Sequence, residues 1–196
     1  MRVLVVGATG TIGTEIVKAL VPDHSVIQVS RSHTPVTVDI GDPESICRMY
    51  DAVGQIDAVV SAAGATRRKP LSQLTDEDFA FSIDNKLMGQ INLVRYGLDY
   101  VADGGSFIVT TGVLGRQPIM GSEAIAVVNL GLEGFVRAAA LEMPRGLRVN
   151  AVSPPWVTET LQAVGLQGVN GLPAAAVARM YLEAIMGTQN GDVIGF

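Results

Sequence analysis

The 196-residue chain contains little cysteine, little charge and few aromatic side chains. Its one cysteine, Cys47, excludes an internal disulfide framework and favours a reducing compartment, so we expect a cytoplasmic protein. Charged residues make up 17% of the chain and the net charge is −5, which argues against nucleic acid as a partner. The N-terminal apolar run is too short for a membrane span or a signal segment. His24 and His33 lack neighbours at metal-ligand spacing, so no metal site is expected.

What the chain does contain is an alternation of short, β-branched apolar runs with longer segments of helical period. This alternation predicts an α/β fold in which a doubly wound parallel sheet is covered by helices on both faces, giving three layers in a single domain over residues 1–196. The predicted strands, about seven in all, are Val3–Val6, Ser25–Val29, Val36–Val38, Ala58–Ser61, Ser106–Thr110, Arg148–Val152 and Asp192–Ile194. The predicted helices are Ile12–Leu20, Pro43–Val53, Asp76–Val101, Glu123–Met143 and Pro173–Met186, with cap-like residues Asp42 and Thr75 before two of them.

A glycine-rich turn follows the first predicted strand. Its sequence is Gly7-Ala-Thr-Gly-Thr-Ile-Gly13, and a predicted helix comes directly after it. Glycines allow a sharp turn and a close approach of the backbone to a pyrophosphate, and a helix N-terminus presents free N–H groups to phosphates. The turn therefore predicts a Rossmann-type dinucleotide site that includes Gly7, Thr9, Gly10, Thr11, Ile12 and Gly13. The alternative is a glycine-rich turn without a ligand.

The end of the second predicted strand bears on the choice of dinucleotide. An acidic residue there would bind the ribose 2′-hydroxyl of NAD, but this chain has Ser30, Arg31 and Ser32. A guanidinium between two hydroxyls suits a 2′-phosphate, so NADP is predicted over NAD, unless Arg31 is only a surface residue at a loop tip. Asp39 and Ile40 complete this side of the predicted cofactor site. Asp39 either accepts a hydrogen bond from the adenine amino group or caps the helix that follows.

Four further segments resemble the short-chain dehydrogenase/reductase family, and with the glycine turn they extend over essentially the whole chain. They are VSAAG (Val60–Gly64), GGSFIVTTG (Gly104–Gly112), LEGFVRAAALE (Leu132–Glu142) and RVNAVSPPWV (Arg148–Val157). The resemblance implies that one cofactor loop includes Ser61, Ala62, Ala63 and Gly64, and that a second, over the nicotinamide, includes Pro154 and Val157. It also implies a homodimer or homotetramer that packs through the two longest helices.

The chain departs from this family at the residues that carry its chemistry. In the family a serine binds the substrate carbonyl, a tyrosine donates a proton, a lysine lowers the pKa of that tyrosine, and an asparagine holds a water. The resemblance aligns these four with Gly112, Ile125, Asn129 and Lys86, in that order. No tyrosine in the chain is followed by a lysine four residues later, so the usual pair is absent in any alignment. The chain is most similar to a short, atypical subgroup without the usual catalytic residues.

Lys86, Thr111 and Asn129 are the candidates for replacing this chemistry. A lysine in the interior has a depressed pKa and acts as a general acid or anchors an anion; alternatively, Lys86 pairs with a carboxylate or reaches solvent. Thr111 and Thr110 offer hydroxyls to a carbonyl oxygen, and Asn129 offers its amide to the nicotinamide ribose. Trp156 either packs over the nicotinamide or anchors its loop.

Two loops complete the predicted site. The basic run Arg67-Arg68-Lys69 follows the fourth predicted strand and either steers an acidic substrate or forms a solvated loop face. The segment Thr158–Leu172 contains three glycines and is predicted to be a shortened substrate flap.

The cofactor apparatus is better preserved than any other site, which favours an NADP(H)-dependent oxidoreductase acting on a small carbonyl or alkene substrate. Two alternatives stay open: a non-catalytic NADP(H)-binding sensor or scaffold, and a non-redox enzyme on the same fold. A reductase oxidises NADPH with some substrate, a sensor binds it without turnover, and a non-redox enzyme does not need it.

Overall fold

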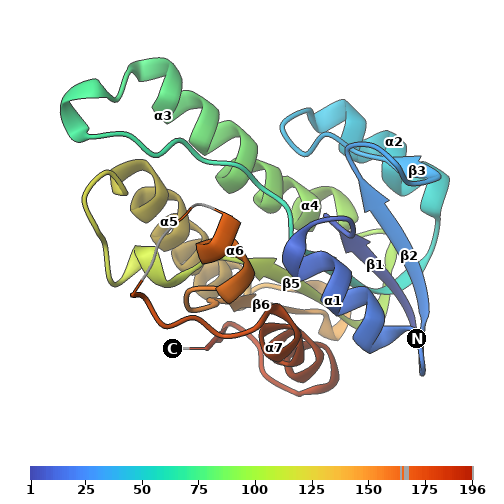
Figure 1. Cartoon of the computed structure of the whole chain (residues 1–196). Helices are drawn as coiled ribbons and strands as arrows, with labels where there is room; N and C mark the ends of the chain where they lie inside the picture. Colours follow the sequence, from blue (N-terminus) through green and yellow to red (C-terminus); the bar gives the residue numbers. More distant parts are fainter. Residues whose placement is uncertain (164, 166–167, 196) are drawn as a thin grey trace.

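A seven-stranded, all-parallel sheet runs through the centre of the protein (Figure 1). The computed structural model describes residues 1–163, 165 and 168–195. The strand order is β3-β2-β1-β4-β5-β6-β7, which confirms the predicted doubly wound fold and puts the topological switch point between β1 and β4. The strands are β1 Arg2–Val6, β2 Ser25–Ser30, β3 Val36–Thr37, β4 Ile56–Ser61, β5 Val101–Thr110, β6 Arg148–Val152 and β7 Val193–Ile194.

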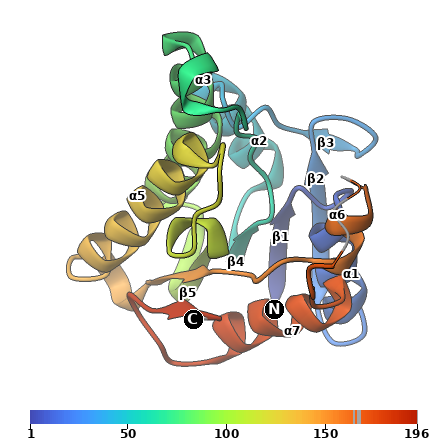
Figure 2. The ribbon, with the colours of Figure 1, turned by 60° about the vertical axis from the view of Figure 1, so that its left-hand side comes forward.

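Helices cover both faces of the sheet. One layer contains α1 and α7, which pack against each other, and the other contains α2, α4 and α5 (Figures 1 and 2). The α-helices are α1 Thr11–Leu20, α2 Pro43–Val53, α3 Asp76–Ser82, α4 Gly89–Gly97, α5 Glu123–Ala139, α6 Thr158–Ala163 and α7 Ala174–Met186. Shorter segments are η1 Leu71–Gln73, the π-helical η2 Ile83–Met88, η3 Val113–Gly115 and η4 Pro144–Gly146. None of the described helices combines the length and the hydropathy that a membrane crossing requires.

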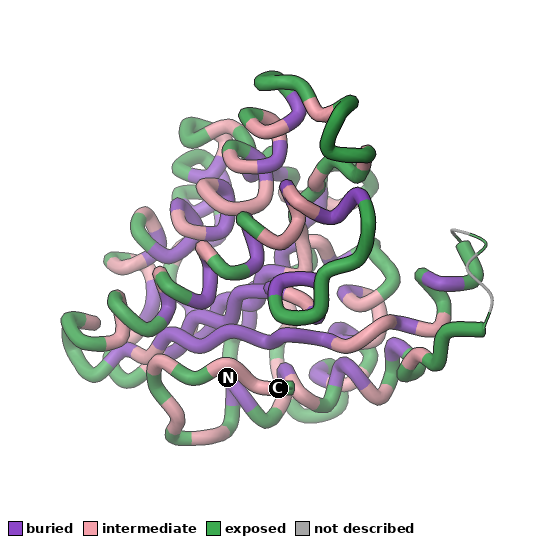
Figure 3. The backbone as a smooth tube through the Cα atoms, turned by 90° about the vertical axis from the view of Figure 1, so that its left-hand side faces the viewer, coloured by how far each residue is buried: buried purple, intermediate pink, exposed green. Residues whose placement is uncertain are grey.

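The central strands are buried on both sides, which explains why their sequences are continuous apolar runs and not alternating patterns. Val3 and Val5 of β1 pack in the layer of α1 and α7. Leu4 and Val6 pack in the layer of α2, α4 and α5. Figure 3 shows the buried strands at the centre of the molecule and the exposed residues on the outer turns. The sheet is therefore a rigid base for anything bound at its carboxyl edge.

Two predicted helix starts are confirmed by their capping contacts. The carboxylate of Asp42 accepts a hydrogen bond from Glu44 N at 3.0 Å at the start of α2. Thr75 and Asp78 form a capping box before α3, in which Thr75 Oγ1 accepts from Asp78 N at 3.3 Å. Since Asp42 caps α2, Asp39 does not have that role.

In the structure, the predicted helix Asp76–Val101 is divided into three parts. The prediction that it extends to Val101 is wrong. The segment runs through α3, η2 and α4, which ends at Gly97. Tyr100 N then donates to Gly97 O at 3.0 Å, and Val101 starts β5 by pairing with Ile56 of β4. Apolar periodicity did not show this turn because the turn depends on strand pairing with a distant segment.

Two other boundaries also differ from prediction. The predicted helix Glu123–Met143 ends earlier, at Ala139, and a turn and a 3₁₀ segment then lead into β6. The predicted flap Thr158–Leu172 contains the short helix α6, which its glycines did not indicate. Residues 164, 166 and 167 of that flap lie outside the described residues.

Candidate functional site

The glycine turn between β1 and α1 lies at the switch point, against the loop that follows β4. Gly7 has a φ of +85°, and a Cβ atom on it would lie 2.7 Å from Ala62 O. A Cβ atom on Gly13 would lie 2.0 Å from Gly7 O, so the packing of α1 against the turn excludes any side chain there. The turn is thus a backbone-lined concavity at a helix N-terminus, which is the arrangement that accepts a pyrophosphate.

Two cavities lie along the carboxyl ends of the strands and share Ala62, Ala63 and Gly64. The first, the glycine-turn cavity, extends from the glycine turn to the ends of β2 and β3 and has a volume of about 270 Å³. The second, the Lys86 cavity, lies between η2, the end of β5 and α5 and has a volume of about 340 Å³. Because they share these three residues, the two cavities adjoin at the edge where ligands of this fold bind, and the pair is called the groove below.

Most of the predicted cofactor residues line this groove. Those in the glycine-turn cavity are Gly7, Thr9, Gly10, Ser30, Arg31, Ile40, Ala62, Ala63 and Gly64. Those in the Lys86 cavity are Ile12, Ala62, Ala63, Gly64, Pro154 and Val157. Sequence reasoning missed Asn85, which reaches the glycine-turn cavity from η2 while its Oδ1 accepts from Ala65 N at 2.7 Å. The sequence signal that could have indicated Asn85 as a site residue was its position directly before Lys86.

Five predicted cofactor residues lie outside both cavities. They are Thr11, Gly13, Ser32, Asp39 and Ser61. The carbonyl of Ser32 accepts from the hydroxyl of Ser30, which shapes the loop after β2. Asp39 Oδ1 accepts from Gly41 N at 3.0 Å, and Asp39 Oδ2 lies 3.9 Å from Arg31 Nε. An exposed ion pair of this length is weak, so it leaves the Arg31 guanidinium able to turn toward an anion.

Lys86 on η2, Thr111 directly after β5 and Asn129 on α5 come together in the second cavity. Lys86 Nζ donates to Asn129 Oδ1 at 2.8 Å and to Thr111 O at 3.1 Å. Asn129 is buried, and its Nδ2 donates to Gly112 O at 3.1 Å. Burial lowers the pKa of Lys86 to about 8. Of the described residues that line this cavity, Lys86 alone has a charged side chain.

Two backbone features direct Lys86 into this cavity. The first is the π-helical turn of η2, a rare conformation that occurs most often at functional sites. The second is Gly64, whose φ is +134° and on which a Cβ atom would lie 2.7 Å from Lys86 Cγ. The glycine of the VSAAG segment therefore makes room for the lysine side chain.

The positions that the resemblance assigns to serine and tyrosine present no hydroxyl to the cavity. Gly112 has φ 153° and ψ 158°, a conformation that favours glycine, and a Cβ atom on it would lie 3.3 Å from Asn129 Nδ2. Ile125 lines the cavity with an apolar side chain. The hydroxyl of Thr111 lies 3.4 Å from Val152 O, so what Thr111 contributes to the Lys86 cluster is its carbonyl oxygen.

A buried hydroxyl network lies next to the same cavity. Thr110 Oγ1 donates to Ser61 O at 2.5 Å and lies 2.7 Å from Tyr181 Oη. Burial raises the pKa of the Tyr181 phenol, so this tyrosine stays protonated and serves as a structural contact. Gln90 pairs with the backbone of Thr110, with Nε2 donating to its carbonyl at 2.8 Å and Oε1 accepting from its N–H at 2.7 Å. The sequence did not indicate that Tyr181 contacts Thr110, because Tyr181 lies on α7, 71 positions further along the chain.

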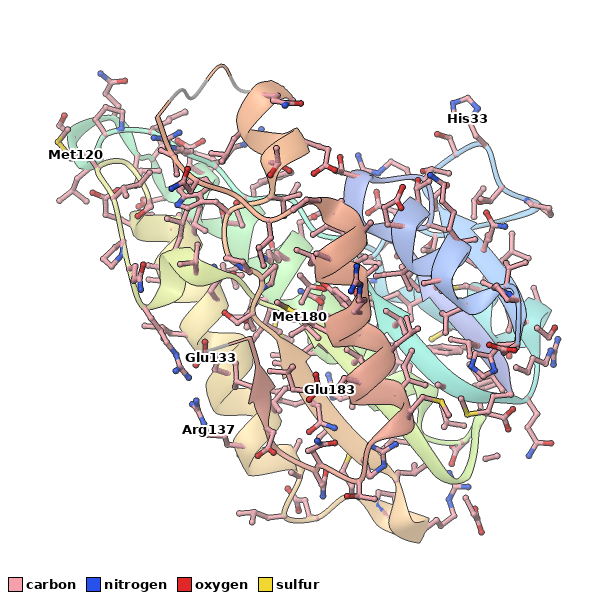
Figure 4. The ribbon with its side chains drawn as sticks, turned by 60° about the horizontal axis from the view of Figure 1, so that its bottom comes forward. His33, Met120, Glu133, Arg137, Met180 and Glu183 are labelled. Carbon is pink, nitrogen blue, oxygen red and sulfur yellow. The ribbon has the colours of Figure 1, made fainter. Side chains whose placement is uncertain are left out.

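A charged cluster ties the loop after η3 to α5. Glu133 is buried, and its Oε2 accepts from Arg116 Nη2 at 2.7 Å and from Arg137 Nη2 at 3.1 Å. Figure 4 shows Glu133 and Arg137 on successive turns of α5. Arg116 lines neither cavity, so its contact with Glu133 holds the segment that follows Gly112 in place.

The basic run after β4 is partly neutralised. Lys69 Nζ lies 2.6 Å from Asp78 Oδ2, and this contact lowers the pKa of the Asp78 carboxyl. Arg67 lies 3.9 Å from the centre of the Phe81 ring and 3.9 Å from Asp78 Oδ1. These contacts favour a structural loop over a free steering patch. Across the described residues, no three His, Cys, Asp or Glu side chains lie close enough to hold a metal ion.

Comparison with solved structures gives close matches over almost the whole chain. The crystal structure of the protein lin1944 from Listeria innocua matches with a TM-score of 0.96 and 41% identity, over 98% of each chain. The crystal structure of a small-chain dehydrogenase in complex with NADPH matches with a TM-score of 0.87 and 25% identity, over 99% of this chain and 95% of that one.

Named relatives match over shorter stretches. Hydroxynaphthalene reductase arp2 of Aspergillus fumigatus is 32% identical over 105 residues, which are 53% of this chain and 38% of that protein. Acetoacetyl-CoA reductase of Cupriavidus necator is 30% identical over 121 residues, which are 60% of this chain and 49% of that enzyme. The match thus extends over no more than about half the length of these relatives. The family described as enoyl-(acyl carrier protein) reductase, adh_short_C2, matches residues 8–192, and with this sheet order and glycine turn the chain belongs to the short-chain dehydrogenase/reductase family.

Proposed function

We propose that this chain is an NADP(H)-binding oxidoreductase that reduces a small carbonyl or alkene compound at a non-standard active site centred on Lys86. The observation that carries the proposal is the pair of adjoining cavities, with the glycine turn and Arg31 at one end and the Lys86 cluster at the other. The NADPH complex of a structural relative, and the reductase names of two sequence relatives, support it.

Each part of NADP(H) has a matching feature in the groove. The pyrophosphate fits the backbone concavity between Gly7 and Ala62 at the N-terminus of α1. Arg31, at the end of β2, suits the 2′-phosphate that distinguishes NADP from NAD. Pro154 and Val157 in the wall of the Lys86 cavity would hold the nicotinamide, which would supply a hydride when bound.

Lys86 supplies the proton in this proposal. Its ammonium is held by Asn129 Oδ1 and Thr111 O, which fixes its position in the cavity wall. An ammonium has three N–H donors, so one remains for the oxygen of a substrate. Lys86 binds that oxygen, gives it the proton it needs when the adjoining carbon is reduced, and regains a proton from water. A lysine whose pKa is about 8 is close to the operating range of a general acid near neutral pH.

The non-standard character of the site belongs to the proposal. The resemblance assigns the family's tyrosine and serine to Ile125 and Gly112, neither of which can donate a proton. A general acid typically contributes about 10²- to 10⁴-fold in rate. In this proposal Lys86 is the group that supplies this contribution, and we expect faster turnover of carbonyl or alkene compounds that accept hydride readily.

The test is a calorimetric titration of the cofactor-free protein with NADPH and with NADH. NADPH should bind more tightly, and Arg31→Ala should weaken NADPH binding by about 10-fold or more, because a charge-assisted hydrogen bond is lost, while NADH binding changes little. Arg179→Ala, at an exposed position on α7, is the matched control and should bind like the unmodified chain. Equal weak binding of both dinucleotides would show that the groove is not an NADP site.

A non-catalytic NADP(H)-binding sensor is the second candidate, and Ile125 in the place of a proton donor is the observation that favours it. Tight NADPH binding without oxidation of NADPH by any of a broad set of aldehydes, ketones and enones would select the sensor. Oxidation that is lost in Lys86→Met would select the reductase.

We also propose a cytoplasmic homodimer or homotetramer that assembles through α5. The exposed side of this helix carries Val127, Leu130, Gly134 and Ala138 at helical spacing, and 50% of Val127 and 47% of Leu130 are accessible in the single chain. Small and apolar residues at this spacing allow close helix packing. Light scattering should give a mass above 20.6 kDa, and Leu130→Arg should return it to that value.

A further inference from the structure

The Lys86 ammonium lies in the wall of its cavity with only neutral acceptors. Both of them, Asn129 Oδ1 and Thr111 O, are uncharged oxygens. The lowered pKa of Lys86 arises from burial, so desolvation of the charge is not offset by a neighbouring anion. A cation in a partly dry cavity is most strongly stabilised by an anionic partner.

The carboxylates on the elements packed around Lys86 do not supply that partner. Asp78 on α3 and Glu133 on α5 form ion pairs with arginine or lysine side chains. Asp84 on η2 is exposed, and Glu123 in the first turn of α5 lines neither cavity. Among the residues that the structure describes, none forms an ion pair with Lys86, so the countercharge has to arrive with the ligand.

The remaining wall is uncharged and, apart from threonines such as Thr160, mostly apolar. Its apolar part is formed by Val113, Leu114, Ile125, Pro155 and Trp156. Such a wall strongly disfavours a second charge on the ligand, because that charge would lose its hydration without gaining a partner. The cavity has a volume of about 340 Å³, which also limits the size of the ligand. Part of this volume lies next to the residues that it shares with the glycine-turn cavity.

We infer that the Lys86 cavity is a receptor for a single negatively charged oxygen on a compact, otherwise apolar molecule, namely a carboxylate or a phenolate. The inference rests on the proposed function and deepens it, because such an anion resembles the oxyanion that forms when a carbonyl compound is reduced. Substrates are then uncharged carbonyl compounds with apolar bodies, and free monocarboxylates occupy the same place as inhibitors. Compounds that carry a second charge are excluded.

The inference is tested by comparing benzoate with benzamide, which has nearly the same shape and no charge. The full chain is titrated with each compound by calorimetry, with and without NADP⁺. Trp156 is the only tryptophan in the chain and lines the cavity, so its fluorescence gives a second measure of binding at this place. Benzoate should bind about 10-fold or more tightly than benzamide at pH 7, as expected for a charge-assisted hydrogen bond.

Lys86→Met should abolish the preference for benzoate and weaken benzamide binding much less than benzoate binding. Lys18→Met, at an exposed position of α1, is the matched control and should keep the preference. In the unmodified chain, benzoate affinity should fall as the pH rises above about 8, where free Lys86 loses its proton, while benzamide affinity stays flat. This pH dependence keeps the test decisive even if Lys86→Met does not fold.

The inference would be overturned by any of three results. These are equal affinities for benzoate and benzamide, a preference for benzoate that survives in Lys86→Met, and no binding of either compound. NADPH binding in the same preparation is measured separately. A chain that binds NADPH but shows no preference for benzoate therefore contradicts only the anion receptor. A chain that binds benzoate through Lys86 but does not bind NADPH contradicts only the proposed oxidoreductase.

Discussion

The two ends of the groove differ in what they are made of. The glycine-turn cavity is built largely from backbone, and its shape depends on the absence of side chains at Gly7 and Gly13. The Lys86 cavity is lined by side chains from elements far apart in the sequence, and two of these side chains, Lys86 and Asn129, are joined by a hydrogen bond. In the function proposed above, the backbone end follows the family pattern and the side-chain end departs from it.

This difference reflects how each end works. A phosphate-binding turn has few solutions, because glycine alone permits the close approaches measured at Gly7 and Gly13. A proton donor and its supports can be supplied by several residue types from several directions, provided that they meet at one point. The predictions below separate the two ends experimentally, in order of decreasing expected effect.

Replacing the ammonium should have the largest effect on turnover. Lys86→Met is expected to lower kcat by about 10²- to 10⁴-fold, because the proton donor is lost, while the affinity for NADPH changes little. Steady-state NADPH oxidation and a cofactor titration measure the two quantities. Parallel loss of turnover and NADPH binding would mean that the two ends do not act separately.

Adding one methyl group to the glycine turn should mainly affect folding stability and NADPH binding. In Gly13→Ala the new Cβ atom lies 2.0 Å from Gly7 O, so the turn must open. We expect a loss of about 1–3 kcal/mol in the free energy of unfolding, as for overpacked sites, together with weaker NADPH binding. Urea unfolding and calorimetry provide the measurements. Ala175→Ser, at an exposed position of α7, is the control and should retain stability and binding.

The pH dependence of turnover should show that the proton for the substrate comes from Lys86, in the Lys86 cavity. Because burial lowers the pKa of Lys86 to about 8, the ammonium form predominates below that pH and is lost above it. The value of kcat/KM should therefore be flat near neutral pH and fall about 10-fold for each unit above pH 8, as a single acidic group requires. Lys86→Arg should keep the group charged and remove this fall. A profile that rises through pH 8 would contradict the role of Lys86 as an acid.

Removing the Tyr181 hydroxyl should have the smallest effect. Tyr181→Phe deletes the contact of 2.7 Å with Thr110 Oγ1, which keeps its second partner, Ser61 O. The expected loss is about 0.5–1.5 kcal/mol in the free energy of unfolding, with NADPH affinity unchanged. Urea unfolding at matched protein concentration measures it. A large loss of turnover without loss of stability would instead give this network a role in the chemistry.

Much of the fold followed from local patterns. The β-branched runs and the capping residues Asp42 and Thr75 report on their own neighbourhood, and their predictions are confirmed by the strands and caps of the structure. The boundary at Gly97 and the helix α6 were not predicted, because the first depends on pairing between Val101 and Ile56 and the second lies in a segment read as a glycine-rich flap.

The sequence by itself determined a doubly wound sheet, a glycine turn at the end of β1 and a basic residue directly after β2, since each depends on neighbouring residues. Only the tertiary structure decided that Lys86 meets Asn129, 43 positions further along the chain, and that its acceptors there are neutral. Parallel strands bring residues together at one edge of a sheet regardless of their separation in sequence. Which side chain then points into a cavity depends on packing, here on a π-helical turn and on the space left by Gly64.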